Sequence, residues 1–415
     1  MTIDPERLLQ RFLRYVRVDT TADETAGVYP SSPGQLELGR MIADELRDIG
    51  LVNVEQNRHG IVTATLPGTT DHEAPAVALC AHLDTSPETT GKNVQPQVIR
   101  DYAGGDLVLS GDPQQVIRTA DNPELGDLHG CTLVTTDGTT LLGGDDKAGL
   151  AVIVEAVAML QQATDVVHAP LRICFTCDEE IGRGVDHVDV AGLNAAVCYT
   201  LDGAGAGDID VETFSADLAI VKVRGVNIHP SIAKDRMVNA IRAAGDFLGR
   251  LPQGQQSPET TADRDGFLHP YGIEGGVAEA TVRIILRDFD TEQLAVKADL
   301  LRRAATETMA SVAGCEIEVN VTPQYRNLGD GLVKEPRAAA FATEAHRRLG
   351  REAQQTIVRG GTDGSLLTEQ GLPTPNLSTG QHNPHSPLEW ACLDEMVLAT
   401  EVLIELAQVW ATEES

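Results

Sequence analysis

Histidine and acidic residues follow four short apolar runs of the chain, at the points where those runs end. A further acidic pair opens a long apolar stretch, so the polar groups come from five distant segments: His82 and Asp84, Asp145 and Asp146, Glu179 and Glu180, Asp202, and His385. Gathered without a cation, the carboxylates would repel one another and lose solvation. Zinc accepts imidazole nitrogen and carboxylate oxygen, and catalytic zinc keeps one position open for water. We therefore predict a metal site, and this many ligands suit two ions better than one.

Two of these segments indicate specific roles. In His82-x-Asp84, one ring nitrogen can bind metal while the neighbouring carboxylate accepts the other ring N–H, which fixes the tautomer. In Glu179-Glu180, one carboxylate can ligate while the other serves as general base beside a metal-activated water. Each pattern alone has an ordinary explanation. The first also occurs as a polar loop after a strand, and acidic pairs are favourable at a helix N-terminus.

Two glycine-containing segments also contain acidic residues. In GGDDKAG (143–149), Asp145 can bridge two cations, although an N-cap aspartate in a turn explains the same pattern. The segment LDGAGAGD (201–208) contains half of a dinucleotide-binding fingerprint. The helix that should open at its last glycine is missing, because IDVETFSADL is typical of an extended strand. Asp202 as a metal ligand is therefore the preferred interpretation of this segment.

These residues need a sheet to bring them together. The runs 75–81, 171–177 and 195–201 are short and continuously apolar, as in parallel strands covered on both faces. A helix-patterned stretch, KAGLAVIVEAVAMLQQ, lies between the first two runs. Ligands of open α/β sheets bind beyond the carboxyl ends of the strands. We predict an α/β fold whose large catalytic domain has a mixed, mainly parallel sheet flanked by helices.

The pattern changes between residues 211 and 323, where strands and helices alternate in the order β-α-β-β-α-β. This order predicts a smaller α+β, ferredoxin-like domain inserted into the large one. The expected division is 1–210 for the first part of the catalytic domain, 211–323 for the inserted lid or dimerisation domain, and 324–415 for the second part. His229-Pro230 in the insert is either an ordinary turn or a lid histidine that meets substrate on closure.

Composition excludes several classes of partner. Lys and Arg total 32 against 62 Asp and Glu, and a net charge of −30 disfavours nucleic acid and anionic membranes. No apolar run is long enough to span a bilayer, and charges interrupt the N-terminal MTIDPERLLQRFLRYV, so we expect a cytoplasmic protein without a secretory signal. Seven scattered cysteines argue against a disulfide framework and favour buried core thiols.

The ordered motifs resemble a known family. AHLDTSP, LLGGDDKAG, FTCDEEIG, YTLDG, IHPSIAKDRMVNA, IILRDFD, RGGTDG and NPHSPLE are similar to the peptidase T group of aminotripeptidases. That group belongs to the dinuclear zinc peptidase superfamily, which includes glutamate carboxypeptidase and the aminoacylases. The resemblance extends from RFLRYVRVDT to the last helix, and GKNVQP (91–96) is more particular to the aminotripeptidases.

The resemblance implies two zinc ions per subunit, which Co²⁺ or Mn²⁺ can replace. The implied ligands are His82 and Asp202 for one ion, Glu180 and His385 for the other, and Asp145 between both. It further implies that Asp84 orients His82, that Glu179 is the general base and proton shuttle, and that the Asp145–Asp146 peptide is cis. Substrate-binding candidates from the same comparison are His229, Lys234, Asn239, Arg287 and Arg359.

The sequence departs from the family pattern near the last ligand. Gln381 and His382 stand where a glycine and an aromatic residue are expected, so His382 is a competing ligand in principle, although the step from Asn383 favours His385. Ala204 and Ala206 interrupt the glycines after Asp202. None of these changes affects an implied metal ligand.

The implied activity is removal of the N-terminal residue from short peptides, mainly tripeptides, through attack by metal-activated water. The expected partners are a short peptide with a free N-terminus and a second copy of the chain, paired through the inserted domain. The main alternative is a related metallo-amidohydrolase, either a carboxypeptidase or an N-acyl amino acid deacylase. A nucleotide-dependent oxidoreductase built on GAGAGD and a non-catalytic metal-binding protein are further alternatives.

Overall fold

The computed structural model describes residues 2–412, which form two compact units. The first unit contains the described residues up to Val211, the segment Gly331–Thr356, and the described residues from Thr362 onward. The second unit contains Glu212–Asp330 and the short segment Ile357–Gly361. The second unit is thus built from chain that interrupts the first.

The described part of the first unit contains a mixed sheet of eleven strands. Its main path runs β1-β2-β8-β3-β9-β16-β17-β7-β4, and β10 and β15 pair beside β16. The bounds are β1 Val52–Gln56, β2 Val62–Leu66, β3 Val77–His82, β4 Gln97–Ile99, β7 Leu133–Thr135, β8 Leu171–Thr176, β9 Val197–Ala204, β10 Asp208–Thr213, β15 Gln354–Val358, β16 Asn376–His382 and β17 Trp390–Cys392. The central strands β8, β3, β9 and β16 run parallel, as predicted for the apolar runs.

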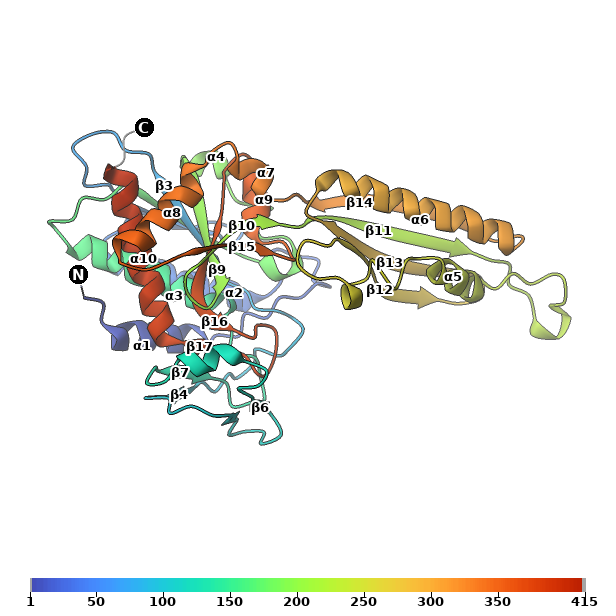
Figure 1. Ribbon diagram of the computed structural model, residues 1–415, viewed down its shortest axis with the longest axis horizontal. Helices are drawn as coiled ribbons and strands as arrows, with labels where there is room; N and C mark the ends of the chain where they lie inside the picture. Colours follow the sequence, from blue (N-terminus) through green and yellow to red (C-terminus); the bar gives the residue numbers. More distant parts are fainter. Residues whose placement is uncertain (1, 413–415) are drawn as a thin grey trace. The chain divides into compact units, whose positions relative to one another are not determined.

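Helices flank this sheet (Figure 1). They are α1 Pro5–Tyr15, α2 Pro33–Ile49, α3 Gly144–Gln162, α4 Val190–Leu193, α7 Gly329–Leu332, α8 Arg337–Arg348, α9 Asp363–Glu369 and α10 Leu393–Thr412, with the 3-10 turns η1 Pro123–Asp127 and η2 Glu179–Ile181. Helix α3 packs on β3, β9 and β16 and also contacts α1 and α10. Its nearly continuous apolar sequence therefore reflects burial on several sides.

Ordinary capping residues mark the ends of the first two helices. The Asp4 carboxylate accepts the backbone N–H groups of Glu6 and Arg7 at the start of α1. Gly50 ends α2 with a φ of 102°, a left-handed conformation that glycine adopts at little cost. No helix among residues 2–412 is both long and apolar enough to cross a lipid bilayer.

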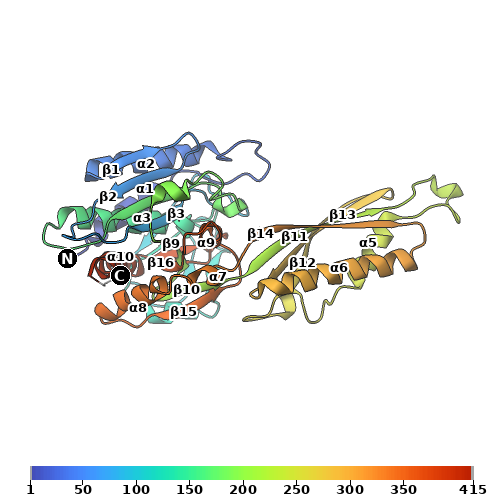
Figure 2. The ribbon, with the colours of Figure 1, turned by 90° about the horizontal axis from the view of Figure 1, so that it is seen from above.

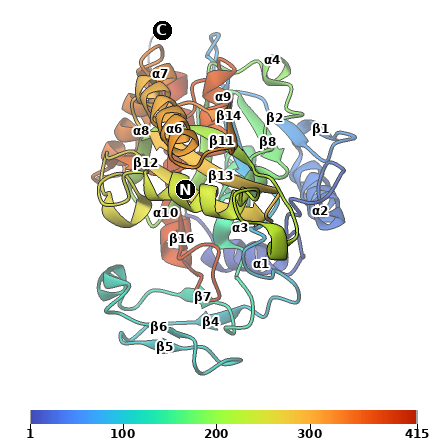
Figure 3. The same ribbon diagram turned by 90° about the vertical axis from the view of Figure 1, so that its right-hand side faces the viewer.

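A small β-rich region completes the first unit. Strands β5 Leu107–Val108 and β6 Val116–Ile117 form a separate hairpin, and β4 pairs with β7 at the edge of the large sheet. Figure 3 shows β4, β5, β6 and β7 gathered together. The sequence pattern did not predict this region, because its strands have only two or three residues.

The second unit is a four-stranded antiparallel sheet in the order β12-β13-β11-β14. Its elements are β11 Ser215–Arg224, η3 Pro230–Ile232, α5 Ala240–Gly249, η4 Pro258–Thr260, β12 Phe267–Gly275, β13 Glu279–Asp288, α6 Thr291–Ser311 and β14 Glu316–Tyr325. Helices α5 and α6 lie on one face of this sheet (Figure 2), and their apolar residues share one core with alternate residues of β11 and β13. The predicted β-α-β-β-α-β order and the α/β fold class are confirmed.

Candidate dinuclear metal centre

The parallel strands bring the predicted ligands to one edge of the large sheet. His82 ends β3 in register with Thr176, the last residue of β8, and Glu180 follows that strand in η2. Asp202 lies in β9, and His385 follows β16. Because these strand ends are adjacent, side chains that are distant in sequence converge at one place.

Asp145 is at the centre of this cluster. One of its carboxylate oxygens, Oδ1, lies 2.8 Å from His82 Nε2, and the other, Oδ2, lies 3.4 Å from His385 Nε2. Asp202 Oδ1 lies 3.8 Å from His82 Nε2, and Glu180 Oε2 lies 2.9 Å from His385 Nε2. The cluster therefore has two halves, each with one imidazole and one carboxylate, and Asp145 faces both.

Two groups of possible ligand atoms each fall within 4.8 Å: His82 with Asp145 and Glu180, and His82 with Asp146 and Asp202. Asp146 is fully buried, and its two carboxylate oxygens accept the backbone N–H groups of His82 (3.1 Å) and Gly149 (3.2 Å). Its oxygens are thus used by the backbone, whereas those of Asp145 face the histidines. The Asp145–Asp146 peptide is cis, as the resemblance implied.

The turn before Asp145 is fixed by Glu389, which sequence reasoning missed. This buried carboxylate accepts the backbone N–H groups of Leu142 (2.7 Å), Gly143 (2.8 Å) and Asp145 (3.0 Å). Burial raises the pKa of Glu389 to about 7, against the effect of these hydrogen bonds. Glu389 therefore sets the backbone position from which Asp145 faces the two histidines.

Asp84 holds the segment that carries both glutamates. Its carboxylate oxygens accept the backbone N–H of Glu179 (3.0 Å) and of Glu180 (3.1 Å). The nearest Asp84 atom to His82 Nδ1 is the backbone carbonyl oxygen at 3.1 Å, while the carboxylate lies at 3.5 Å. Asp84 thus contacts the ring that it was expected to orient, and it also positions the acidic pair.

Two more residues outside the predicted set support the cluster. Asp178 adopts a left-handed backbone, and its carboxylate accepts hydrogen bonds from Ser31 and Gln35, which fixes the turn into Glu179. Gln381 donates to the carboxylate of Asp202 at 3.2 Å and to its carbonyl oxygen at 3.0 Å. Neither role has a sequence signal, because both depend on contacts between segments that are distant in the chain.

The electrostatics of the cluster favour a cation. Burial, with help from the charge of Asp145, raises the pKa of Glu180 to about 8 and that of Asp202 to about 6. Hydrogen bonds to Asp145 and Glu180 raise the pKa of His385 to about 11. Protons bound to these groups therefore offset the negative charge of the clustered carboxylates. Glu180 Oε1 is buried and has no hydrogen-bond partner in the described structure, so it is an acceptor that a metal ion would satisfy.

His82 and Glu179 are perturbed in the same sense. Burial opposes the charged form of His82, but its hydrogen bonds to Asp145 and Asp202 outweigh that cost and raise its pKa well above the usual value. Burial raises the pKa of Glu179 well above that of an ordinary glutamate. A carboxyl group with a raised pKa beside the cluster suits a general base that must both take and release a proton near neutral pH.

His382, the competing ligand, lies elsewhere. Its ring stacks on Trp390 at 3.7 Å between centroids, and its Nε2 lies 2.7 Å from Glu395 Oε2. Its other nitrogen lies 3.6 Å from Glu124. The structure gathers His385, not His382, with the other candidate ligands.

The five substrate-binding candidates all belong to the second unit, and the structure does not gather them in one place. Arg287 pairs in register with Ala216 at the start of β11 and donates to the carbonyl of Arg359 at 3.3 Å. The others lie in the connection beyond the opposite end of that ten-residue strand: His229, Lys234 and Asn239. At roughly 3.3 Å per residue, the two groups are separated by about 30 Å within this unit.

These candidates also differ in how much of their bonding capacity is already used. Asn239 accepts the backbone N–H of Ile241 (2.9 Å) as the N-cap of α5. Arg359 donates to the carbonyl oxygens of Asp263 and Asp265 and stacks over Phe214. Arg287 keeps a buried Nε without a hydrogen-bond partner among the described residues. The buried Nε without a partner distinguishes Arg287 from Asn239 and Arg359.

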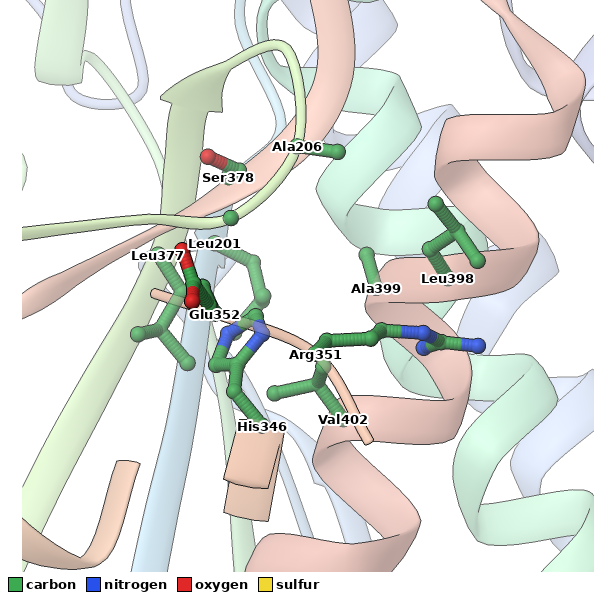
Figure 4. Close-up of a pocket in the computed structure, with 11 residues that line it drawn as sticks. Leu201, Ala206, His346, Arg351, Glu352, Leu377, Ser378, Leu398, Ala399 and Val402 are labelled. Atoms are coloured by element: carbon green, nitrogen blue, oxygen red, sulfur yellow. The ribbon is translucent and has the colours of Figure 1, made fainter. Parts of the chain in front are cut away.

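A separate cavity lies beside the strand that carries Asp202. It has a volume of about 230 Å³ and is lined mainly by apolar side chains, including Leu201, Leu377 and Val402 (Figure 4). His346 and Arg351 form its polar edge. None of the predicted site residues lines this cavity.

An α/β unit that gathers two imidazoles and several carboxylates at the carboxyl ends of its parallel strands defines the class of metal-dependent hydrolases. The profile of one family, described as peptidase family M20/M25/M40, matches residues 135–409. A peptidase T from Geobacillus thermodenitrificans is 41% identical over 405 residues, which cover 98% of each chain. The chain belongs to peptidase family M20/M25/M40, and the resemblance inferred from its motifs is confirmed.

Solved structures share the fold. A tripeptidase from Staphylococcus aureus aligns with a TM-score of 0.76 over 100% of both chains at 24% identity. A dinuclear metal-binding peptidase of family M20 from Bacillus subtilis aligns with a TM-score of 0.65 over 98% of each chain at 18% identity. The fold of the chain is thus shared with these solved structures.

Proposed function

We propose that the chain is a dinuclear metallo-aminopeptidase that removes the N-terminal residue from short peptides, mainly tripeptides. The observation that carries this proposal is the position of Asp145, whose two carboxylate oxygens face two different histidines. Support for the substrate class comes from relatives that are called peptidase T and tripeptidase.

The donor set fits two zinc ions. His82 and Asp202 would hold one ion, Glu180 and His385 the other, and Asp145 would bridge both, with Co²⁺ or Mn²⁺ able to substitute. When bound, the ions lower the pKa of a coordinated water and polarise the peptide carbonyl. Such ions would satisfy the unpartnered Glu180 Oε1 and would displace the proton held by His385.

The chain's own residues supply the proton transfers and the binding of substrate. Glu179 takes the proton of the attacking water and then delivers it to the leaving amine, a role that its raised pKa suits. Asp84 keeps Glu179 and Glu180 in place through their backbone N–H groups. Arg287, whose Nε has no hydrogen-bond partner among the described residues, would bind a carbonyl or carboxylate of the peptide. Arg359, whose carbonyl accepts a hydrogen bond from Arg287, is proposed as a substrate contact beside it. His229, Lys234 and Asn239 are further proposed contacts, although at about 30 Å they lie too far from Arg287 to bind the same tripeptide from one chain.

We also propose that the enzyme acts in the cytoplasm and that two copies pair through the second unit. The exposed edge strands of the four-stranded sheet, β12 and β14, are surfaces on which an isologous pair can form. Light scattering at micromolar concentration tests this assembly. A particle with the mass of a single chain would exclude it.

The function is tested by metal analysis together with a paired substrate assay. We expect at least two ions per chain, hydrolysis of a free tripeptide, and loss of that activity on chelation with recovery on addition of Zn²⁺. The N-acetylated form of the same tripeptide should resist cleavage, because an aminopeptidase needs the free amine. Faster cleavage of the acetylated peptide would instead establish the alternative, an N-acyl amino acid deacylase. Release of the C-terminal residue would establish a carboxypeptidase.

A further inference from the structure

A second group of metal-type ligands lies where β7 and β17 meet the start of α10. One donor atom from each of Cys131, Cys392 and Asp394 falls within 4.8 Å of the other two. None of these residues belongs to the dinuclear cluster, and the family motifs do not include them. Two thiols with one carboxylate form a ligand set of the kind that soft or borderline divalent ions prefer.

The backbone fixes these donors in place. Strands β7 and β17 pair antiparallel, with Cys392 opposite Leu133. Just beyond this pair, the Leu393 N–H donates to the Thr132 carbonyl at 2.9 Å, and the Thr132 N–H donates to Asp394 Oδ2 at 2.8 Å. Asp394 Oδ1 remains available as a ligand. The strand pairing and these hydrogen bonds therefore fix the backbone that carries Cys392 and hold one carboxylate oxygen of Asp394.

The charge around the thiols lacks a cationic partner. Cys392 lies fully buried directly before α10, and Cys131 is partly buried. Burial and the nearby carboxylates raise the pKa of both thiols. Glu395 is engaged with His382, and Asp394 has no ion pair with Lys or Arg within residues 2–412. A divalent ion would supply the missing positive charge.

We propose that Cys131, Cys392 and Asp394 form a third metal site, separate from the dinuclear centre and specific for Zn²⁺ or a similar thiophilic ion. Binding releases the two thiol protons to solvent and forms two metal–sulfur bonds and one metal–oxygen bond. Water completes the tetrahedral set, since Asp394 is exposed and Cys131 is partly exposed. The ion would link the loop before β7 to the first turn of α10, so this site has a structural role.

The test uses Cd²⁺ titration of the full chain, whose dinuclear centre is first filled with Zn²⁺, in the presence of a phosphine reductant. The proposed ligands of the dinuclear centre include no sulfur, so ultraviolet absorption from thiolate-to-metal charge transfer reports on thiol sites alone. We expect a band that saturates at one Cd²⁺ per chain. Absence of the band would overturn the proposal.

Variants assign that band to specific residues. Cys131→Ser and Cys392→Ser should each abolish it, and Asp394→Asn should weaken Cd²⁺ binding about tenfold. Cys315→Ser, in the second unit, is the matched control and should leave the band unchanged. A band that persists in Cys392→Ser would assign it to other thiols, such as the neighbouring Cys80 and Cys174 of the sheet, and would contradict the proposal.

Two further measurements separate loss of the site from loss of fold. Circular dichroism and tripeptide hydrolysis of each serine variant should match the parent, because none of these residues lies in the dinuclear cluster. Excess Zn²⁺ should raise the thermal unfolding midpoint of the parent above that of the two-ion enzyme, but not that of Cys131→Ser. Equal Zn²⁺-dependent shifts in both proteins, or a Cys131–Cys392 disulfide in place of metal binding under reducing conditions, would contradict the proposal.

Discussion

The two oxygens of Asp145 link the two halves of the candidate centre at the scale of single residues. Each oxygen lies within 3.4 Å of a different imidazole, so neither half is complete without this carboxylate. Glu179 differs from the other acidic residues, because its backbone is held by Asp84 while no hydrogen bond to its carboxylate is found in the described structure. Substituting the proposed base should therefore have a different effect from substituting a proposed metal ligand.

Replacing the proposed base should separate catalysis from metal binding. In Glu179→Gln, the side chain keeps its shape but cannot accept a proton, so we expect tripeptide turnover to fall by about 10²–10⁴-fold while the metal content stays at that of the parent. Glu180→Gln, which removes a ligand, should lose metal and activity together. Metal analysis and kcat for both variants check this, and hydrolysis by Glu179→Gln at the parent rate would refute the assignment.

Glu389 is expected to position the backbone of Asp145 and to take no part in proton transfer. In Glu389→Gln, one acceptor oxygen replaces two, so at least one of the three backbone N–H groups around Asp145 loses a partner. Outer contacts of this kind change metal affinity by about 10–100-fold, and we expect a loss in that range. Competition with a chromophoric chelator measures it. Glu73→Gln, on an exposed loop, is the control and should bind metal as the parent does.

Metal binding should depend steeply on pH. Without metal, hydrogen bonds to Asp145 and Glu180 raise the pKa of His385 to about 11, and the pKa of His82 is also well above its usual value. His385 therefore carries a proton at pH 7 that metal must displace, and Glu180, whose pKa is raised to about 8, also holds a proton in most molecules, so affinity rises with pH. Calorimetry in buffers with different ionisation enthalpies counts these protons. Release of no protons at pH 7 would show that the metal-free cluster is not protonated.

At the scale of secondary structure, buried ion pairs link α1 to α3. The Glu155 carboxylate of α3 is fully buried and pairs with Arg11 and Arg7 of α1. Helix α3 begins at the turn that carries Asp145, so the α1–α3 contact supports the element that positions the bridging ligand. The resulting stability rests on one buried carboxylate and two guanidinium groups.

Arg11→Leu should destabilise the first unit by about 3 kcal/mol, because it leaves a buried carboxylate with only the more exposed Arg7 as partner. The double variant Arg11→Leu/Glu155→Leu should be less destabilised, since no buried charge then remains unpaired. Arg14→Ala, which removes an exposed partner of Glu45, should cost less than about 1 kcal/mol. Urea unfolding followed by tryptophan fluorescence measures all three. A double variant less stable than Arg11→Leu would contradict this account.

The elements that sequence could predict are those with a local signal. The continuous apolar runs identified β3, β8 and β9 because parallel strands are buried on both faces. Strands such as β4 and β7 are too short to show a period. The supporting contacts of Glu389 and Gln381 join segments far apart in the chain, so no spacing of residues indicates them. Family motifs implied the proposed ligand set, whereas the unpartnered Nε of Arg287 needed coordinates.

On the scale of the whole molecule, the two units have separate cores. Helices α5 and α6 close one core on the four-stranded sheet of the second unit. The candidate metal centre, by contrast, lies entirely in the first unit. Both tryptophans, Trp390 and Trp410, are also buried in the first unit, so tryptophan fluorescence reports on that unit alone. Far-ultraviolet circular dichroism reports on both units.

Chelation should therefore destabilise one unit and leave the other unchanged. Since metal binds only the folded first unit, its removal should lower the midpoint followed by tryptophan fluorescence by several degrees. Circular dichroism should retain a second transition at the same temperature with and without chelator. The excised segment 212–330, which carries the apolar residues of the second core, should unfold at that same temperature. A single transition that moves as a whole on chelation, by both probes, would show instead that the two units unfold as one cooperative body.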